Sequence, residues 1–440
     1  MGEPIATAGV AANGASYPSA GRGRYLVCVL TLAYAISFID RQIFSLLVAP
    51  IRADLALSDT DLSLLQGFAF AVFYTGFGLP LGFLADRLNR RNLMIFGIVT
   101  WSLATSAAAF AHSYGFLFLA RMLVGAGEAA LSPAAYSMLS DSIAPDRRAR
   151  ALSIYASGIF LGSGLALMLG GSIASSADQL SGLAAGWGVK MQGWQIALLV
   201  AGLPGLPVTL LLATLPEPGR GERAVPADGR PSFALSLRLI RRRWLDYAIV
   251  IAALALLSTV FYGFFAWFPT IVMRRYGWSA ARFGWHFGPI VLLLGPAGMW
   301  LGGWITDRRA RAGRAAPALL PMGAGLVAVL VFGLALAAAS DVTVALLLSA
   351  PLMLALALPS SLGPTFLQAI TPNEARGLIT ALYLFGVNLI GLALGPTLVA
   401  WLSDTIFAGH LAFGLALTVI AVMPPAIVLI LGLNAKLEHS

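Results

Sequence analysis

The sequence predicts an all-α membrane protein in which twelve transmembrane helices form two pseudo-symmetric six-helix bundles. Three observations lead to this fold class: an apolar composition, twelve long apolar windows, and short motifs that recur in both halves. Hydrophobic residues make up 59% of the 440 residues and charged residues only 11%, and the mean hydropathy is +0.84. A soluble chain has about a quarter of its residues charged. Lipid is therefore the solvent for most of these side chains.

Apolar windows of about 20 residues define the helices in chain order. Before the first window, residues 1–22 are rich in Gly, Ala and Ser and lack the apolar core of a signal peptide, so we expect a disordered cytoplasmic tail. Prolines and glycines inside many windows indicate kinked, closely packed helices. The expected spans are 24–51, 60–85, 92–110, 114–140, 150–175, 194–215, 245–272, 279–305, 316–339, 342–368, 375–401 and 410–433.

The longest polar interruption divides these spans into two sets of six. It covers residues 216–243 and contains the run PEPGRGERAVPADGR. We therefore expect an N-terminal bundle over 23–215, a cytoplasmic linker over 216–243 and a C-terminal bundle over 244–440.

The distribution of basic residues predicts the orientation, because cytoplasmic loops carry an excess of Lys and Arg. With a cytoplasmic N-terminus, most of the 28 basic residues fall on the inner side. This predicts cytoplasmic termini in a plasma membrane, the inner membrane of a bacterium. It also explains the isoelectric point near 10.0 by contact with anionic lipid headgroups and not with nucleic acid. The exceptions are Arg52, Lys190, Arg274, Arg275 and Arg282 on the outer side, where Arg274 and Arg275 are expected to be interfacial anchors, and Arg41 and Arg121 within spans.

Internal repetition supports the two-bundle prediction. The loop after the second span reads GFLADRLNRR and the loop after the eighth reads GWITDRRARAGR, and both contain GxxxDR. The same separation relates Gly82 to Gly303 and Asp86 to Asp307. The loops after the fourth and tenth spans read APDRRARAL and TPNEARGLI. A tandem duplication of this kind is typical of transporters whose halves rock about a site near the membrane midplane.

These motifs carry a resemblance to a known family. Gly82, Asp86, Arg87, Arg90 and Arg91 resemble the loop signature of the major facilitator superfamily, and the resemblance covers both halves. In the N-terminal half, SFIDR, LLQGF, RMLVGAGEA and GSGL resemble the spinster family of lipid transporters. That resemblance implies the major facilitator fold and a sphingolipid or lysophospholipid cargo. The anion:cation symporter branch has a similar acid–arginine pair in span 1 and a similar GEA in span 4, and is the alternative.

Four charged residues lie deep within the expected spans. Asp40 and Arg41 are adjacent in SFIDRQIF, and at 1.5 Å per residue Asp40 is about 16 Å from the outer end of its span. Neighbours on a helix point about 100° apart, so each needs a partner elsewhere. The fourth span supplies Arg121 and Glu128 on one face, about 10 Å apart and at depths of about 10 and 21 Å. Two acids and two bases thus gather at one level.

Intramembrane charges by default indicate an ion pathway, a proton relay or a substrate site. A carboxylate beside an arginine that can move away is poised to titrate. We therefore expect Asp40, Glu128, Arg121 and Arg41 to couple transport to protons, with Arg121 changing partner between the acids. The alternative is a structural role, in which the four residues satisfy one another and lock spans 1 and 4 together.

The loop signature implies a second functional group. In the superfamily, its acid and arginines hold the cytoplasmic side closed. By resemblance, Asp86 faces the start of span 11, Arg87 or Arg91 reaches Asp141, and the glycine permits close helix approach, while positive-inside bias explains Arg90. In the second copy the arginines after Asp307 and Arg308 are displaced. The expected cytoplasmic gate comprises Gly82, Asp86, Arg87, Arg91, Asp141, Asp307 and Arg308.

The C-terminal half has no charge deep within its spans, but span 7 carries FYGFFAWFP. A cavity between the halves would then be charged on one wall and aromatic on the other. Such a cavity suits an amphipathic anion with a phosphate or carboxylate head and an apolar tail. The alternative is that these aromatics face lipid or form an interfacial belt. Candidate pocket residues are Tyr155, Phe261, Phe264, Phe265, Tyr383 and Asn388.

Other function classes lack their sequence signals. The chain has one cysteine and four scattered histidines without metal-ligand spacing, and no Walker A segment GxxxxGK[ST]. We expect neither an enzyme nor a cofactor, with a proton gradient as the energy source. A channel would more often be an oligomer of a shorter chain. The sequence thus predicts a monomeric, proton-coupled secondary active transporter that works by alternating access on an amphipathic anionic lipid; the alternative cargo is a small organic anion. Its expected partners are membrane lipids, protons and that substrate, and not nucleic acid.

Overall fold

The structure is a computed structural model that describes residues 19–85, 87–186, 191–218, 238, 240–372 and 375–438. Within these residues every regular element is a helix. Eleven helical segments are long and apolar enough to cross a membrane. A twelfth helix, α5 (Arg90–Ala108), begins with the polar run RRN and so has a shorter apolar part. It packs against its neighbours in the same bundle and completes the predicted set.

The N-terminal bundle contains six spans, several of which are interrupted by a π-helical turn or a short break. Two further short helices, α2 (Val48–Leu55) and α10 (Ala177–Gly186), lie between spans. The spans are α1 (Ala20–Leu46); α3 (Asp59–Ser63), η1 (Leu64–Phe68) and α4 (Ala69–Ala85); α5; α6 (Tyr114–Glu128) and α7 (Leu131–Ser142); α8 (Pro145–Leu165), η2 (Ala166–Gly170) and α9 (Gly171–Ser175); and α11 (Gly193–Gly202) and α12 (Gly205–Ala213).

The C-terminal bundle contains longer uninterrupted helices, and its fifth span again carries a π-helical turn. Its elements are α14 (Trp244–Tyr276), α15 (Ala280–Arg311), α16 (Leu319–Ala338), α17 (Val342–Ala369), α18 (Arg376–Gly386), η4 (Val387–Leu392), α19 (Ala393–Ile406) and α20 (Leu411–Glu438).

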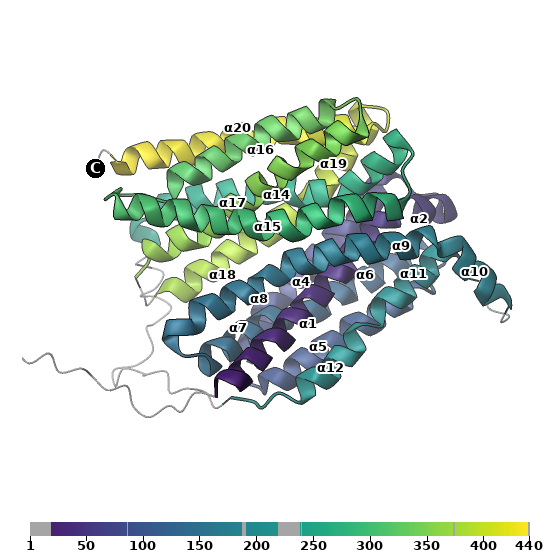
Figure 1. Ribbon diagram of the computed structural model, residues 1–440, viewed down its shortest axis with the longest axis horizontal. Helices are drawn as coiled ribbons and strands as arrows, with labels where there is room; N and C mark the ends of the chain where they lie inside the picture. Colours follow the sequence, from purple (N-terminus) through teal and green to yellow (C-terminus); the bar gives the residue numbers. More distant parts are fainter. Residues whose placement is uncertain are drawn as a thin grey trace, which may run out of the picture.

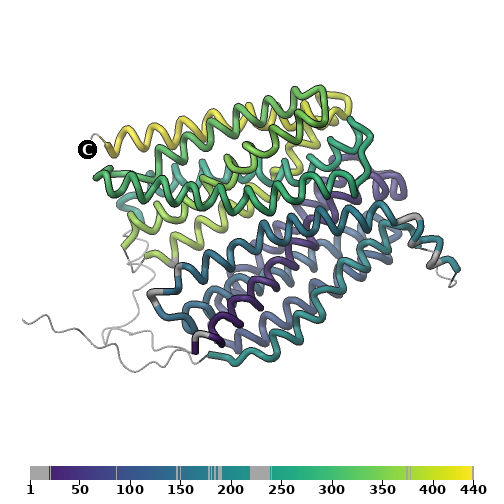
Figure 2. The backbone as a smooth tube through the Cα atoms, in the orientation of Figure 1, coloured from purple at the N-terminus to yellow at the C-terminus, as the bar shows by residue number. Residues whose placement is uncertain are grey.

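The two bundles lie side by side with their helices running roughly lengthwise (Figure 1). The same division is visible along the chain in Figure 2, where the purple-to-teal half lies below the green-to-yellow half. The start of α1 and the end of α20 lie at one end of the molecule, called here the terminal end. The short helix α2 lies at the opposite end, called here the distal end.

The first expected span, 24–51, is wrong in one respect, because it is broken at Leu47. Helix α1 ends at Leu46 and α2 begins at Val48. Pro50 explains the break: in a continuous helix its ring would clash with the carbonyl of Leu46, four residues earlier. Asp40 is therefore about 9 Å from the end of its helix at 1.5 Å per residue, and not 16 Å.

The backbones of the two bundles come close together at glycines. A Cβ added at Gly67 on η1 would lie 2.6 Å from the carbonyl oxygen of Leu392, and one added at Gly288 on α15 would lie 2.8 Å from that of Gly164. The separation that relates Gly82 to Gly303 also relates Gly67 to Gly288. Corresponding glycines of the repeat thus allow helices of opposite bundles to touch, as small residues do in membrane proteins.

Several polar contacts join the bundles between the level of Gln42 and the distal end. They are the hydrogen bond from Gln42 to the carbonyl of Phe265 (3.2 Å), the bonds from Thr60 to Asp404 (2.7 and 2.9 Å), the ion pair of Asp59 with Arg274 (2.5 Å), and the bonds from Trp285 to Ser172 (3.1 Å) and from the Ala281 amide to Ser175 (2.9 Å).

Candidate functional site

The four predicted intramembrane charges meet between α1 and α6. Arg41 contacts Glu128 through Nη2 at 2.5 Å and Nε at 2.7 Å, and Arg121 lies 3.6 Å from Asp40. Asp40, Arg121 and Glu128 are 3%, 4% and 2% exposed, so these charges are withheld from water. As expected, the adjacent residues Asp40 and Arg41 do not pair with each other, and each has a partner elsewhere, in both cases on the fourth span; their role in proton coupling stays a prediction.

Arg41 and Glu128 form the tighter pair. Two guanidinium nitrogens approach the same oxygen, Glu128 Oε2. Aromatic rings surround the guanidinium carbon, with centroids at 4.4 Å (Phe70), 4.6 Å (Phe38) and 4.8 Å (Tyr74). Cation–π attraction of this kind strengthens when the cation is desolvated. The arginine charge is thus supported by one carboxylate and three rings.

Asp40 and Arg121 form the looser pair. At 3.6 Å the contact is an ion pair without a hydrogen bond, and both carboxylate oxygens of Asp40 are buried without a hydrogen-bond partner among the described residues. Arg121 instead donates its Nε hydrogen to the carbonyl of Leu65 at 3.3 Å. A buried carboxylate with so little support is costly to keep charged.

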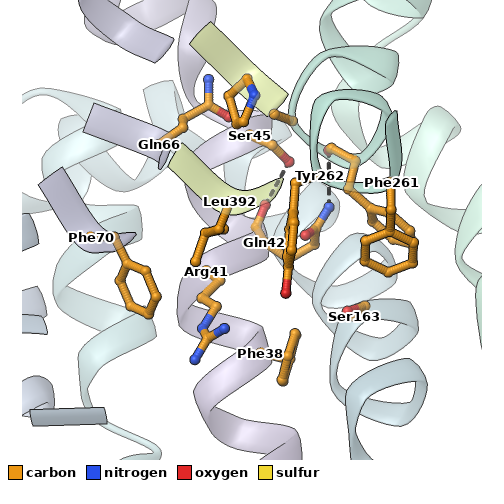
Figure 3. Close-up of a pocket in the computed structure, with 13 residues that line it drawn as sticks. Phe38, Arg41, Gln42, Ser45, Gln66, Phe70, Ser163, Phe261, Tyr262 and Leu392 are labelled. Carbon is orange, nitrogen blue, oxygen red and sulfur yellow. Dashed lines mark hydrogen bonds between the residues drawn. The ribbon is translucent and has the colours of Figure 1, made fainter. Parts of the chain in front are cut away.

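A cavity of about 50 Å³ lies beside Arg41, between the two bundles (Figure 3). Gln42 crosses it to donate a hydrogen bond to the carbonyl of Phe265 at 3.2 Å, and Gln66 Nε2 is buried there without a partner. The N-terminal side supplies Phe38, Arg41, Gln42, Ser45, Gln66, Phe70 and Ser163, and the C-terminal side supplies Phe261, Tyr262, Phe265, Ala266, Leu392 and Pro396.

Two of the six predicted pocket residues line this cavity, namely Phe261 and Phe265. Phe264 is fully buried and stacks on Phe268 behind the wall, at 4.7 Å between centroids. Tyr155 stacks on Tyr34 inside the N-terminal bundle, also at 4.7 Å.

Tyr383 on α18 and Asn388 on η4 are half-buried and do not line the cavity either. For all six residues the substrate-binding role stays a prediction.

Gln42, Gln66 and Tyr262 are among the cavity residues that sequence reasoning missed. The available signals were weak. Gln66 lies in the π-helical turn η1, a feature often found at functional sites, but π turns have no reliable sequence signature. Tyr262 directly follows Phe261, and Gln42 directly follows Arg41.

At the terminal end, Arg90 and not Arg87 or Arg91 reaches Asp141, so that prediction is wrong. Arg90 is 1% exposed and forms ion pairs with both Asp141 and Glu217, the latter at 2.8 Å. The physical reason is position: Arg90 is the first residue of α5 and points into the contact between α5 and α7. Positive-inside bias alone does not account for such a buried, doubly paired arginine.

The other members of the loop signature have different surroundings. The Arg91 amide donates to Glu217 at 3.1 Å, and Arg87 lies over the Phe83 ring at 3.9 Å. A Cβ at Gly82 would meet only Pro133, at 3.8 Å, so the expected close helix approach there is wrong.

Asp86 lies outside the described residues, and its expected position opposite span 11 stays a prediction. In the second copy, Asp307 and Arg308 are exposed, and Arg308 lies over the Trp304 ring at 5.7 Å. Neither forms an ion pair within the described part of the chain. The gate role expected for both residues stays a prediction.

The chemistry available is that of buried ion pairs beside a small cavity. Among the described residues, no group of three or more His, Cys, Asp or Glu side chains lies close enough to hold a metal ion. Two helical bundles that enclose buried, paired charges are the architecture of a multi-pass membrane transporter. The sequence profile described as Major Facilitator Superfamily matches residues 30–396, and the chain belongs to that superfamily. It is a transporter and not an enzyme.

Curated relatives include transporters of two kinds. The chain is 28% identical over 383 residues to an MFS-type efflux pump of Mycolicibacterium smegmatis, covering 86% of this chain and 84% of that one. It is 31% identical over 265 residues to human protein spinster homolog 1, covering 58% of this chain and 47%, about half, of the human protein. It is 26% identical over 400 residues to the sphingosine-1-phosphate transporter SPNS2 of Danio rerio, covering 86% and 75%.

Solved structures similar to this chain also include a spinster homologue. The crystal structure of a bacterial homolog to the human lysosomal transporter spinster, inward-facing and unoccupied, superposes with a TM-score of 0.81 at 26% identity, covering 96% of this chain and 98% of that one. A D-xylose-proton symporter superposes with a TM-score of 0.69 at 17% identity, covering 92% and 97%, a likeness of fold alone. Within its superfamily the chain resembles the spinster proteins.

Proposed function

We propose that this transporter couples the movement of an amphipathic anionic lipid, of sphingolipid or lysophospholipid type, to protons by alternating access. The observation that carries the proposal is the unequal support of the two buried acids. Glu128 is held by Arg41 at 2.5 Å, whereas Asp40 has one arginine at 3.6 Å and the Thr105 hydroxyl as its polar neighbours, without a well-formed hydrogen bond to either. The printed name of the Danio rerio relative, a sphingosine-1-phosphate transporter, supports the lipid class.

Proton coupling follows from this inequality. A carboxylate paired with arginine in a low-dielectric site stays ionised, and the same carboxylate left alone there prefers to be neutral. A proton on Asp40 therefore removes its attraction for Arg121. The freed guanidinium is then available to Glu128 or to a substrate headgroup. Because the two protonation states favour different arrangements of the charges, the proton biases the two-state equilibrium of the bundles.

Substrate recognition is assigned to the cavity beside Arg41. An anionic headgroup would compete with Glu128 for the Arg41 guanidinium, and an apolar tail would contact Phe261, Tyr262 and Phe265 on the facing wall. The cavity of about 50 Å³ has room for little more than water. Entry of a lipid therefore requires the bundles to move apart, as alternating access demands.

The membrane orientation is also part of the proposal. Arg52, Arg274, Arg275 and Arg282 lie at the distal end, whereas most basic residues belong to the loops of the terminal end. The positive-inside rule then places the terminal end, with both termini, in the cytoplasm of a bacterial inner membrane. The polar contacts described above between the bundles lie toward the distal end, which supports an inward-facing state for this arrangement.

A small organic anion is the second candidate cargo. The small volume beside Arg41 favours it, because a carboxylate-sized substrate needs less rearrangement than a lipid. Both candidates share the anionic head, and they differ in whether the aromatic wall contributes to affinity.

The test is transport by the purified protein in liposomes under a set pH gradient, with lysophospholipids, sphingoid phosphates and small organic anions as substrates. Asp40→Asn and Glu128→Gln mimic the protonated acids, so each should lose gradient-driven accumulation and keep some binding. Arg121→Ala should lose both. Asp341→Asn, which changes a carboxylate that caps α17 outside the cluster, is the matched control.

Two outcomes would count against this proposal. Full pH-driven accumulation in both Asp40→Asn and Glu128→Gln would make the cluster structural. Saturable uptake of the small anions alone would replace the lipid by the second candidate.

A further inference from the structure

A groove of about 460 Å³ lies between α15, α16 and α17 of the C-terminal bundle, away from the charge cluster. Its lining is apolar except for one residue, Arg309. Small residues on α16, among them Ala324 and Ala328, create the hollow because they leave space that larger side chains would fill. The walls are built by residues such as Phe332 and Leu354.

The groove opens toward the bilayer. Ala324 and Leu320 on its rim are exposed although they belong to a transmembrane helix. From Leu320 to Phe332 it follows α16 for about 18 Å at 1.5 Å per residue, more than half of a hydrocarbon core of about 30 Å. This length and chemistry match an extended acyl chain.

Arg309 lies at the terminal end of the groove, in the last turn of α15. Its Nε is buried without a hydrogen-bond partner among the described residues. One other nitrogen, Nη2, donates to Glu438 at 3.2 Å, in a pair that is 21% and 29% exposed. Such a pair contributes little, whereas a buried donor without an acceptor is costly. The Arg309 guanidinium therefore lacks a hydrogen-bond acceptor for its Nε, and it lies at the mouth of the apolar groove.

The neighbouring sequence makes this mouth electropositive. Arg308 and Arg311 share the last turn of α15 with Arg309, and Arg314 follows in the loop, whereas the nearby acids are Asp307 and Glu438. Arg311 donates to the carbonyl of Asp307 at 3.3 Å and not to its carboxylate. Basic pockets between transmembrane helices at the cytoplasmic surface are suited to anionic lipid headgroups.

We propose that this groove binds one anionic phospholipid, with an acyl chain along α16 and the phosphate accepting hydrogen bonds from Arg309. The site shares no residue with the charge cluster or its cavity, and it rests on the proposed function only for the orientation that places its mouth at the cytoplasmic surface. The bound lipid would join α15, α16 and α17. Since α15 also packs against α8, η2 and α9 across the bundle interface, the lipid would stabilise the interface from outside.

The experiment is a titration of the purified protein in detergent with phosphatidylglycerol, followed by native mass spectrometry and by thermal unfolding. Phosphatidylcholine with the same acyl chains and glycerol 3-phosphate are the comparison ligands. The variants are Arg309→Gln, Arg309→Lys and Ala324→Trp. Arg282→Gln removes one exposed charge at the distal end, and Val428→Trp places the same indole side chain on an exposed face of α20; these two are the matched controls.

We expect one saturable phosphatidylglycerol per chain, weakened about tenfold or more in Arg309→Gln because a charge-assisted hydrogen bond is lost. Arg309→Lys should restore part of the affinity. Ala324→Trp should weaken both phospholipids, and the controls should match the wild type. Equal binding by all variants would overturn the proposal. Stabilisation by glycerol 3-phosphate equal to that by the lipid would also overturn it, since the groove would then contribute nothing.

Discussion

Asp59 of the N-terminal bundle and Arg274 of the C-terminal bundle form a bidentate ion pair across the distal interface, with Nη1–Oδ2 and Nη2–Oδ1 distances of 2.5 and 2.7 Å. The Asp59 side chain is 1% exposed and that of Arg274 is 29% exposed. Arg52 adds a weaker contact at 3.4 Å. Arg274 is thus more than the interfacial anchor that the sequence predicts. It joins the two halves of the transporter.

The first prediction is that Arg274→Ala shifts the protein toward a state open at the distal end. Removal of Arg274 leaves the buried Asp59 carboxylate with only Arg52, and an unpaired buried charge is strongly destabilising. The open population should rise at least several-fold. Spin labels at cysteines replacing Phe116 and Phe413, in a Cys28→Ser background, would report the distance between the two distal ends. Arg282→Ala is the control. An unchanged distance distribution in Arg274→Ala would show that the Asp59–Arg274 ion pair does not hold the distal end closed.

The second prediction concerns stability at the terminal end. Arg90→Ala breaks two ion pairs of a buried arginine, so it should destabilise the protein by about 3 kcal/mol. Arg87→Ala, which removes an exposed side chain, should cost less than about 1 kcal/mol. Denaturant titration in detergent would measure both. If Arg87→Ala lowered the free energy of unfolding more than Arg90→Ala, Arg87 and not Arg90 would be the stabilising arginine, as the loop signature predicts.

The third prediction uses the glycine contacts of the interface. In Gly288→Ala the new methyl group would lie 2.8 Å from the Gly164 carbonyl oxygen, closer than real Cβ atoms come, so α15 and α8 must separate. The variant should favour the distal-open state in the same distance measurement. Gly303→Ala meets nothing within 4 Å and should be neutral or slightly stabilising, as expected for alanine in a helix. Identical distances in both variants would contradict this.

The fourth prediction is topological. A cysteine placed at Arg230, in the expected cytoplasmic linker, should not react with an impermeant reagent added to intact cells, whereas a cysteine replacing Phe413 at the distal end should. Both would be tested in the Cys28→Ser background, because Cys28 is a free, exposed thiol. Labelling at position 230 from outside would reverse the proposed orientation.

The fold could be predicted from the sequence because hydropathy and repetition are local properties. The pairing of charges could be predicted only in part. Asp40 and Arg41 point in different directions from their helix, so each needed its own partner. Which acid pairs with which arginine depends on how α6 packs against α1, and the sequence does not give this. The break at Leu47 was accessible through Pro50. The burial of Arg90 was not, because Arg87, Arg90 and Arg91 are the same residue type within five positions and differ in which parts of the chain pack over them.

The position of Arg41 opposite Tyr262 at the cavity has a consequence for the symmetry of the two bundles. The separation that relates Gly82 to Gly303 also relates Asp40 to Phe261 and Arg41 to Tyr262. At corresponding positions of the repeat, the N-terminal bundle thus carries an acid and an arginine, and the C-terminal bundle carries two aromatic rings. The two halves are therefore not interchangeable at the cavity: one presents formal charge to it and the other presents ring faces and edges.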